Sequence, residues 1–206
     1  PKGEHRTMRT FTKHVLLIAV VALLAAGTLR AAEKSPIDVL KSDSTHKEEM
    51  DACRELARTG DKEAVPVLAS MLSDKKLSHV ARYALERIPD PSVDVVLRDA
   101  LNDLEGEPLV GVIGSIGMRR DEKAVGKLAD LLSDENEMVV RAAGRALSKI
   151  ATPEAVEALE SALDERADAS YRTRVSLTES LLDCAEARAE AGDRGQAIAI
   201  YESVLD

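Results

Sequence analysis

Few residues of this chain could do chemistry, and they are scattered. His5 and His14 lie in an N-terminal leader, which leaves His46 and His79. Two histidines cannot form a three-histidine zinc site, and the sequence contains no His-Glu-x-x-His, Cys-x-x-Cys or Cys-x-x-Cys-His motif. We therefore expect no catalytic residue, no metal ligand and no cofactor in this chain.

Three glycines could suggest a phosphate-binding loop. Gly111, Gly114 and Gly117 occur at every third position. A dinucleotide site needs Gly-x-Gly-x-x-Gly after a strand, and a P-loop needs Gly-Lys-Ser/Thr, so neither motif is present. On a helix, small residues at this spacing favour close packing against a neighbouring helix pair.

Apolar residues recur along the chain in a helical stripe with offsets 0, 1, 4, 7 and 8. Copies of the stripe begin at Ala64, Val93, Ala124, Ala155 and Ala197, with steps of 29, 31, 31 and 42 residues. Only Asp94, in the second copy, breaks the pattern.

A second stripe, with offsets 0, 4, 7, 8 and 11, follows the first. It begins at Leu77 and again at Val139, and a degenerate copy begins at Pro108 and ends in Arg119. A pair of such helices cannot bury its apolar faces alone, so the pairs must stack. We predict an all-α fold, an α-solenoid of stacked antiparallel helix pairs.

The residues that carry this pattern are Asp134-Glu-Asn-Glu-Met-Val-Val-Arg-Ala-Ala-Gly-Arg-Ala-Leu147, followed by Thr152-Pro-Glu-Ala-Val156. They resemble HEAT repeats, most closely the short bacterial type named after phycobilisome lyases. The resemblance covers residues 44–170 and is strongest at 121–163. It implies a HEAT-like superhelix whose second helices line a concave surface that binds a protein or peptide.

The C-terminal segment departs from the repeat. We expect residues 171–206 to form a final, longer helix pair, either TPR-like or HEAT-like. Its last apolar helix, which includes Tyr201 and Leu205, lacks the polar capping repeat of a solenoid terminus. We therefore expect the natural protein to continue past Asp206.

The N-terminal segment, residues 1–32, is interpreted as a leader. Basic residues precede an uncharged apolar core at 15–27, which is shorter than a bilayer span and ends in small residues. These are the parts of a bacterial secretory signal peptide, with an uncleaved membrane anchor as the alternative. Residues upstream of Met8 lie outside that signal, and residues 33–43 are expected to be a linker. We expect export to the periplasm or the exterior.

The charge balance excludes two partner classes. The leader holds five basic residues and one acidic residue, so 23 of the 28 basic and 36 of the 37 acidic residues remain. Nucleic acid and anionic lipid attract clusters of Lys and Arg, and none is seen outside the leader. We expect no nucleic-acid partner and no membrane contact after signal cleavage.

The two cysteines, Cys53 and Cys184, are separated by four repeats. Because each repeat advances a helix stack by about 10 Å, their distance exceeds the reach of a disulfide. We expect both to be small buried hydrophobic residues.

The candidate protein-binding residues lie on or near the second helices. Arginine can bind carboxylates with two parallel hydrogen bonds. The alternative is that these residues neutralise local acids, as Arg141 could do with Asp134 or Glu135. The candidates are His79, Arg82, Arg141, Arg145, Arg172 and Arg174.

These observations predict an exported, non-catalytic HEAT-repeat scaffold for protein–protein interaction. The alternative is an interaction segment of a larger secreted enzyme, or of a lyase-like protein, whose catalytic part lies outside this sequence.

Overall fold

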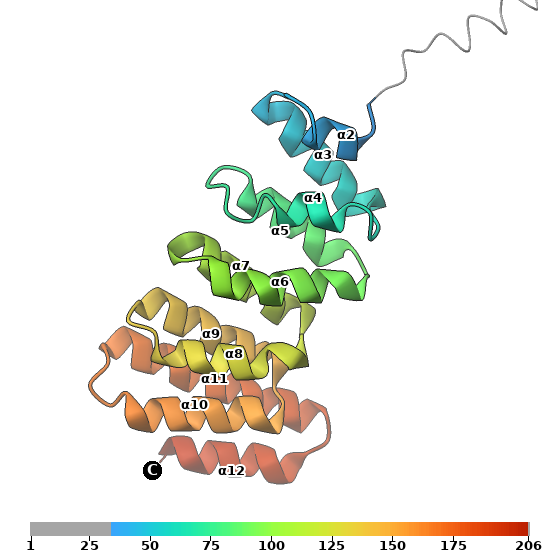
Figure 1. Ribbon diagram of the computed structural model, residues 1–206. Helices are drawn as coiled ribbons and strands as arrows, with labels where there is room; N and C mark the ends of the chain where they lie inside the picture. The colour runs from blue at the N-terminus through green and yellow to red at the C-terminus, as the bar shows by residue number, and fades with distance from the viewer. Residues whose placement is uncertain (1–33, 206) are drawn as a thin grey trace, which may run out of the picture. The chain divides into compact units, whose positions relative to one another are not determined.

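The computed structural model describes residues 34–205, which form one compact unit from Pro36 onward. The expected signal peptide, with its apolar core at 15–27, and the residue Asp206 lie outside the described residues. The described part contains α-helices, two short 3-10 helices and no strand (Figure 1). The helices are α2 (Pro36–Leu40), α3 (His46–Thr59), α4 (Val65–Ala69), α5 (Ser78–Arg87), α6 (Pro91–Asp103), α7 (Gly106–Arg119), η1 (Glu122–Ala124), α8 (Val125–Asp130), η2 (Leu131–Ser133), α9 (Glu137–Ile150), α10 (Pro153–Glu165), α11 (Tyr171–Glu190) and α12 (Arg194–Leu205).

The helices pair in sequence order, and the pairs stack in two layers. α4 packs on α5, α6 on α7, α8 on α9 and α10 on α11. The second helices α3, α5, α7, α9 and α11 each contact the next, and in Figure 1 the first helices α8 and α10 lie in front of α9 and α11. The predicted all-α stack of helix pairs is confirmed.

Helix starts follow local sequence signals. Thr45 and Glu48 form a capping box on α3. The Asp90 carboxylate accepts a hydrogen bond from the Ser92 amide at the start of α6, and Thr152 caps α10 in the same way. Pro91 and Pro153 occupy the first turn of α6 and of α10, where a missing N–H costs no hydrogen bond.

The apolar stripes form the core. At the central position of the first stripe, Leu68, Leu97, Leu128 and Leu159 are all fully buried. The degenerate second helix α7 also buries four apolar residues, which are Leu109, Val112, Ile113 and Ile116. The repeat pattern therefore identified the buried face of four successive first helices.

Two of the first helices are shorter than the stripe predicts. α4 ends at Ala69, and the amides of Met71 and Leu72 bond three residues back instead of four. α8 is flanked by η1 and η2 in the same manner. The 3-10 turns tighten the backbone and still bring Leu72 and Leu132 into the core.

The N-terminal end of the described chain differs from expectation, whereas the C-terminal end has the exposed apolar helix face that its sequence predicts. The segment 33–43, expected to be a linker, contains α2, whose Ile37 and Leu40 pack against the core. In α12, Ala197 is buried, but Ile198 and Leu205 of the apolar stripe are 57% and 85% exposed. α12 packs on α11, and within the described residues no helix covers the opposite face.

Candidate protein-binding surface

One regular set of positions on the second helices is not fully buried. Between their buried residues, α5, α7 and α9 each carry three positions spaced by four residues, at equivalent places in successive repeats. We call these nine residues the second-helix surface. It consists of His79, Tyr83 and Arg87 on α5, Val110, Gly114 and Met118 on α7, and Arg141, Arg145 and Lys149 on α9.

The α5 part of this surface combines aromatic and basic side chains. Tyr83 is 46% exposed, and the Arg87 guanidinium lies 4.8 Å from the centre of its ring. This is a cation–π contact, which holds the ring and the charge together. Tyr83 and His79 also border a groove shared with Arg54 and Arg58 of α3.

The α7 part is small and apolar. Gly114 is partly exposed, and a Cβ placed on it would meet no atom within 4 Å. Val110 is half-buried, and Met118 is 61% exposed. The middle of the second-helix surface is therefore an apolar strip with open space in front of its glycine.

The α9 part is basic. Arg145 and Lys149 are exposed, and neither has a carboxylate within 4 Å in the described part of the chain. Lys149 Nζ lies 3.2 Å from the Met118 Sδ atom of α7. Met138, at the start of α9, is 48% exposed. Two cations thus border the apolar strip on α7.

The structure places the six candidates in different surroundings. Arg82 is half-buried, and its Nη1 donates to the Gly111 carbonyl of the next repeat at 3.1 Å. Burial lowers the pKa of this guanidinium, and the nearby Glu86 opposes that shift. Arg141 pairs with Glu137 at 3.3 Å and donates to Thr173 Oγ1 at 3.0 Å. Local neutralisation of Arg141 is therefore observed, with Glu137 in place of Asp134 or Glu135.

The other candidates are exposed. His79 and Arg145 lie on the second-helix surface, while Arg172 and Arg174 lie at the start of α11. Arg174 borders a separate shallow groove with Tyr171. The candidates therefore do not form one cluster.

Sequence reasoning missed the neutral and methionine side chains between them. The expectation of a carboxylate-binding site selected charged residues only. It therefore did not include the uncharged residues Tyr83, Gly114, Met118 and Met138. Their exposure could have been predicted from their place in the helix, since Tyr83 and Gly114 lie between the apolar positions of the second stripe.

The three α7 glycines have three different surroundings. Gly111 makes room for Arg82, whose guanidinium carbon would lie 2.5 Å from an added Cβ. Gly117 lies against Ala146 of α9, where an added Cβ would be 2.8 Å from the Cα atom. Because a three-residue step falls short of a helical turn, the stripe rotates from the α5 side to the α9 side. Close packing is thus seen at Gly111 and Gly117, and Gly114 between them faces open space.

The cysteines and the acidic residues were also compared with the requirements of reactive and metal-binding sites. Cys53 and Cys184 are free and fully buried, and burial raises the pKa of the Cys53 thiol to about 11 and that of Cys184 to about 12. Thiols with such pKa values are unreactive near neutral pH. Within residues 34–205, no group of three His, Cys, Asp or Glu side chains is arranged to hold a metal ion. No helix in that range is long and apolar enough to cross a bilayer.

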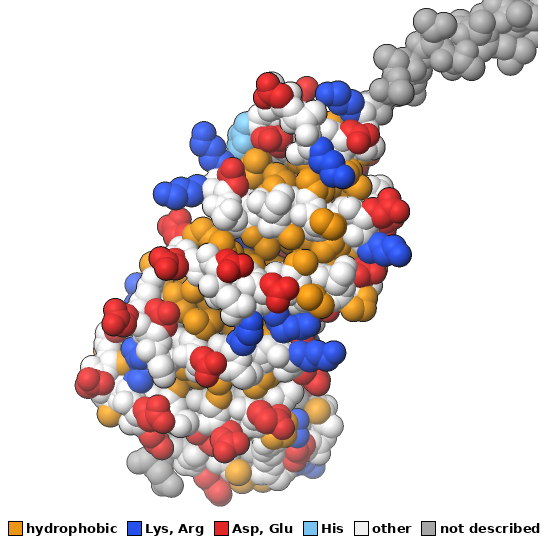
Figure 2. All heavy atoms as spheres, in the orientation of Figure 1, with side chains coloured by type: hydrophobic (Ala, Val, Ile, Leu, Met, Phe, Trp, Pro, Cys, Tyr) orange, Lys and Arg blue, Asp and Glu red, His pale blue; other side chains and the backbone are white. Residues whose placement is uncertain are grey.

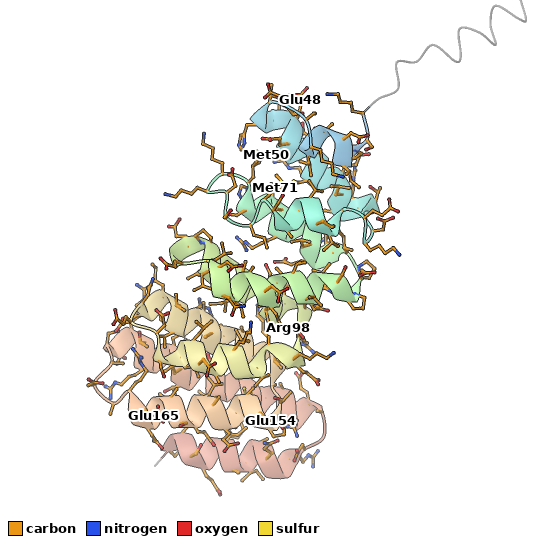
Figure 3. The ribbon with its side chains drawn as sticks, viewed as in Figure 1. Glu48, Met50, Met71, Arg98, Glu154 and Glu165 are labelled. Carbon is orange, nitrogen blue, oxygen red and sulfur yellow. The ribbon has the colours of Figure 1, made fainter. Side chains whose placement is uncertain are left out.

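One of the first helices, α10, is strongly acidic. α10 carries five acidic residues and no basic one. Figure 2 shows acidic side chains spread over the lower part of this side, and Figure 3 places Glu154 and Glu165 towards the two ends of α10. The acidic α10 therefore differs in charge from the basic α9 part of the second-helix surface.

Comparison with known proteins supports the repeat assignment. The family model described as HEAT repeats matches residues 96–181, which run from α6 into α11. Residues 96–181 are therefore similar to HEAT repeats. The HEAT match therefore includes α7 and α9, two of the three helices of the second-helix surface.

A solved structure extends the likeness in fold beyond the HEAT match. A crystal structure described as that of an engineered protein is 18% identical to this chain, with a TM-score of 0.50. The alignment covers 84% of this chain and 97% of the engineered one. At this identity the likeness concerns the fold alone. No curated protein matches the chain in sequence.

Proposed function

We propose that this protein is an exported, non-catalytic HEAT-repeat scaffold that binds a protein partner through its second-helix surface. The observation that carries the proposal is the regular set of exposed side chains on successive second helices. The second helices form a continuous layer, and their outward positions hold exposed aromatic, methionine and basic side chains. Extended repeat surfaces of this kind suit recognition of another chain.

Site-specific photo-crosslinking tests which layer binds. A photoreactive amino acid is placed at Tyr83 or Arg145 on the second-helix surface, and at Glu157 on α10 as a control of similar exposure. We expect a discrete protein adduct from the two second-helix positions after irradiation in cells of the source organism. Adducts from Glu157 alone would overturn the proposal.

Export is supported by the apolar core at 15–27, with its basic residues upstream. Mass spectrometry of the protein recovered from its natural host tests this part. We expect a mature chain that begins after the apolar core. An intact leader on the bulk of the protein would contradict cleavage.

A further inference from the structure

We propose that the second-helix surface recognises an extended acidic peptide segment with one apolar anchor residue, seated at Gly114. This inference rests on the proposed function and adds the chemistry of the partner. Three features on α5, α7 and α9 carry it: the open space, the unpaired cations and their spacing.

The anchor position follows from α7. Gly114 has no atom within 4 Å of a virtual Cβ, and Val110 and Met118 lie one helical turn away on either side. Apolar side chains in this position can cover a partner's aliphatic group. Each buried methylene contributes about 0.8 kcal/mol, so one leucine would be a substantial part of a modest affinity.

The cations flank this anchor on both sides. Arg87 on α5 and Arg145 and Lys149 on α9 have no carboxylate within 4 Å in the described residues. Acids of the same helices are engaged elsewhere: Glu86 accepts from Ser115 Oγ at 2.6 Å, and Glu137 accepts from Ser170 Oγ at 2.6 Å. Lys149 also lines a groove with Asp183, Glu186 and Glu190 of α11, but it is not ion-paired with any of them. The three cations therefore keep charge that an external carboxylate can pair with.

Spacing sets the peptide pattern. Packed helices lie about 8–10 Å apart, and an extended chain advances about 3.3 Å per residue. An extended peptide that crosses α5, α7 and α9 therefore needs about three residues to reach from one helix to the next. The expected ligand has an apolar residue over α7 and carboxylates about three residues before and after it.

Charge favours a peptide over a nucleic acid. The whole chain has a formal net charge of −9, and five of its carboxylates lie on α10 in the other layer. A polyphosphate backbone would be repelled by this field beyond the few cations it contacts. A short acidic segment is limited to the second-helix surface and avoids most of that repulsion.

The test measures binding of labelled synthetic peptides to the purified full chain by fluorescence anisotropy. The probe has eleven residues, with a central leucine, glutamates three and four residues away on both sides, and Gly or Ser elsewhere. Two control peptides replace the glutamates by lysine or the leucine by serine. We expect each control to bind about tenfold more weakly than the probe.

Protein variants locate the site. Arg145→Glu with Lys149→Glu is expected to weaken binding of the probe about tenfold, and Gly114→Leu, which fills the anchor position, should do the same. The matched control, Lys62→Glu with Lys123→Glu, changes the net charge equally at exposed lysines away from this surface. It should bind like the wild type. Circular dichroism confirms that each variant is folded.

Several results would overturn the proposal. They are equal binding of the glutamate and lysine peptides, unchanged affinity in the folded Arg145→Glu/Lys149→Glu variant, or tighter binding of a single-stranded oligonucleotide than of the probe. A crosslinked partner at Arg145 without binding of the acidic probe would reject this inference and leave the proposed function standing. Crosslinks from Glu157 alone would reject both.

Discussion

Asp94 and Arg119, the two charged residues in the apolar stripes of one repeat, pair with each other. Asp94 replaces an apolar residue of the first stripe, and Arg119 stands where the other copies of the second stripe have isoleucine. Arg119 Nε donates to Asp94 Oδ1, and the two side chains are 13% and 26% exposed. Arg119 Nη1 also donates to the Ile88 carbonyl at 2.9 Å, beyond the end of α5. The degenerate repeat thus replaces apolar packing with a polar bridge.

This pairing predicts that substitutions of Asp94 and Arg119 have non-additive effects on stability. Asp94→Ala leaves a mostly buried guanidinium without its carboxylate, and should lower the free energy of unfolding by about 2 kcal/mol. Arg119→Ala should cost at least as much, because it also frees the Ile88 carbonyl. The double variant should cost less than the sum, with a coupling of about 1 kcal/mol or more. Urea denaturation of the four proteins measures it, and strictly additive losses would contradict the pairing.

Two glycines of α7 should respond oppositely to alanine. Gly114→Ala removes backbone freedom in the unfolded chain and meets no atom, so it should stabilise the protein by about 0.5–1 kcal/mol. Gly117→Ala forces α7 away from Ala146 and should destabilise it by about 1–3 kcal/mol. Thermal unfolding compares the two variants. A shift of the same sign in both would contradict the packing described for α7 and α9.

The contacts of Glu137 predict that the stability difference between the wild type and a Glu137→Gln variant depends on pH. Hydrogen bonds from the Ser170 hydroxyl and amide, together with Thr173 and Arg141, lower the pKa of Glu137 below its ordinary 4.5. Since the folded-state pKa is lower than the unfolded one, the stabilisation is present above about pH 4.5 and is lost as the pH falls through the folded value. Glu137→Gln resembles the protonated form.

The wild type should therefore melt at a higher temperature than Glu137→Gln at pH 7, and the difference should shrink at pH 3. Scanning calorimetry at both pH values measures the difference. A gap of equal size at pH 3 and pH 7 would show that the charge of Glu137 makes no contribution.

The repeat core predicts a large effect of a buried charge. Leu128 and Leu159 are fully buried at equivalent positions of α8 and α10. Aspartate at either position would place a carboxylate without a partner inside the stack, at a cost of several kcal/mol. We expect loss of the cooperative unfolding transition, whereas Lys123→Asp at an exposed site should unfold like the wild type. Wild-type unfolding of Leu128→Asp would contradict the repeat assignment.

The sequence was sufficient for the fold because the pattern was redundant. The apolar stripe repeats with Leu68, Leu97, Leu128 and Leu159 at one position, so single breaks such as Asp94 did not hide it. The candidate site was less accessible. That Arg82 lies against Gly111, or that Arg141 bonds Thr173, depends on contacts between repeats 29 and 32 residues apart. Such contacts depend on the exact register of neighbouring helices, which periodicity alone does not define.

The same limit applies to α12. The stripe that begins at Ala197 matches the earlier copies in sequence, but Ile198 and Leu205 are exposed in the structure. Burial of a repeat's face depends on a neighbouring helix, and the pattern within one helix does not report whether that neighbour is present.

Methyl NMR of the methionines tests the central claim, that the second-helix surface is the binding face, most directly. Met118 and Met138 lie on or beside this surface, and Met71 follows α4 on the first-helix side, where Figure 3 labels it. Labelled full chain is titrated with the acidic leucine peptide. We predict saturable shifts of the Met118 and Met138 methyl signals with Met71 unchanged. Shifts of Met71, with Met118 and Met138 unaffected, would contradict the account.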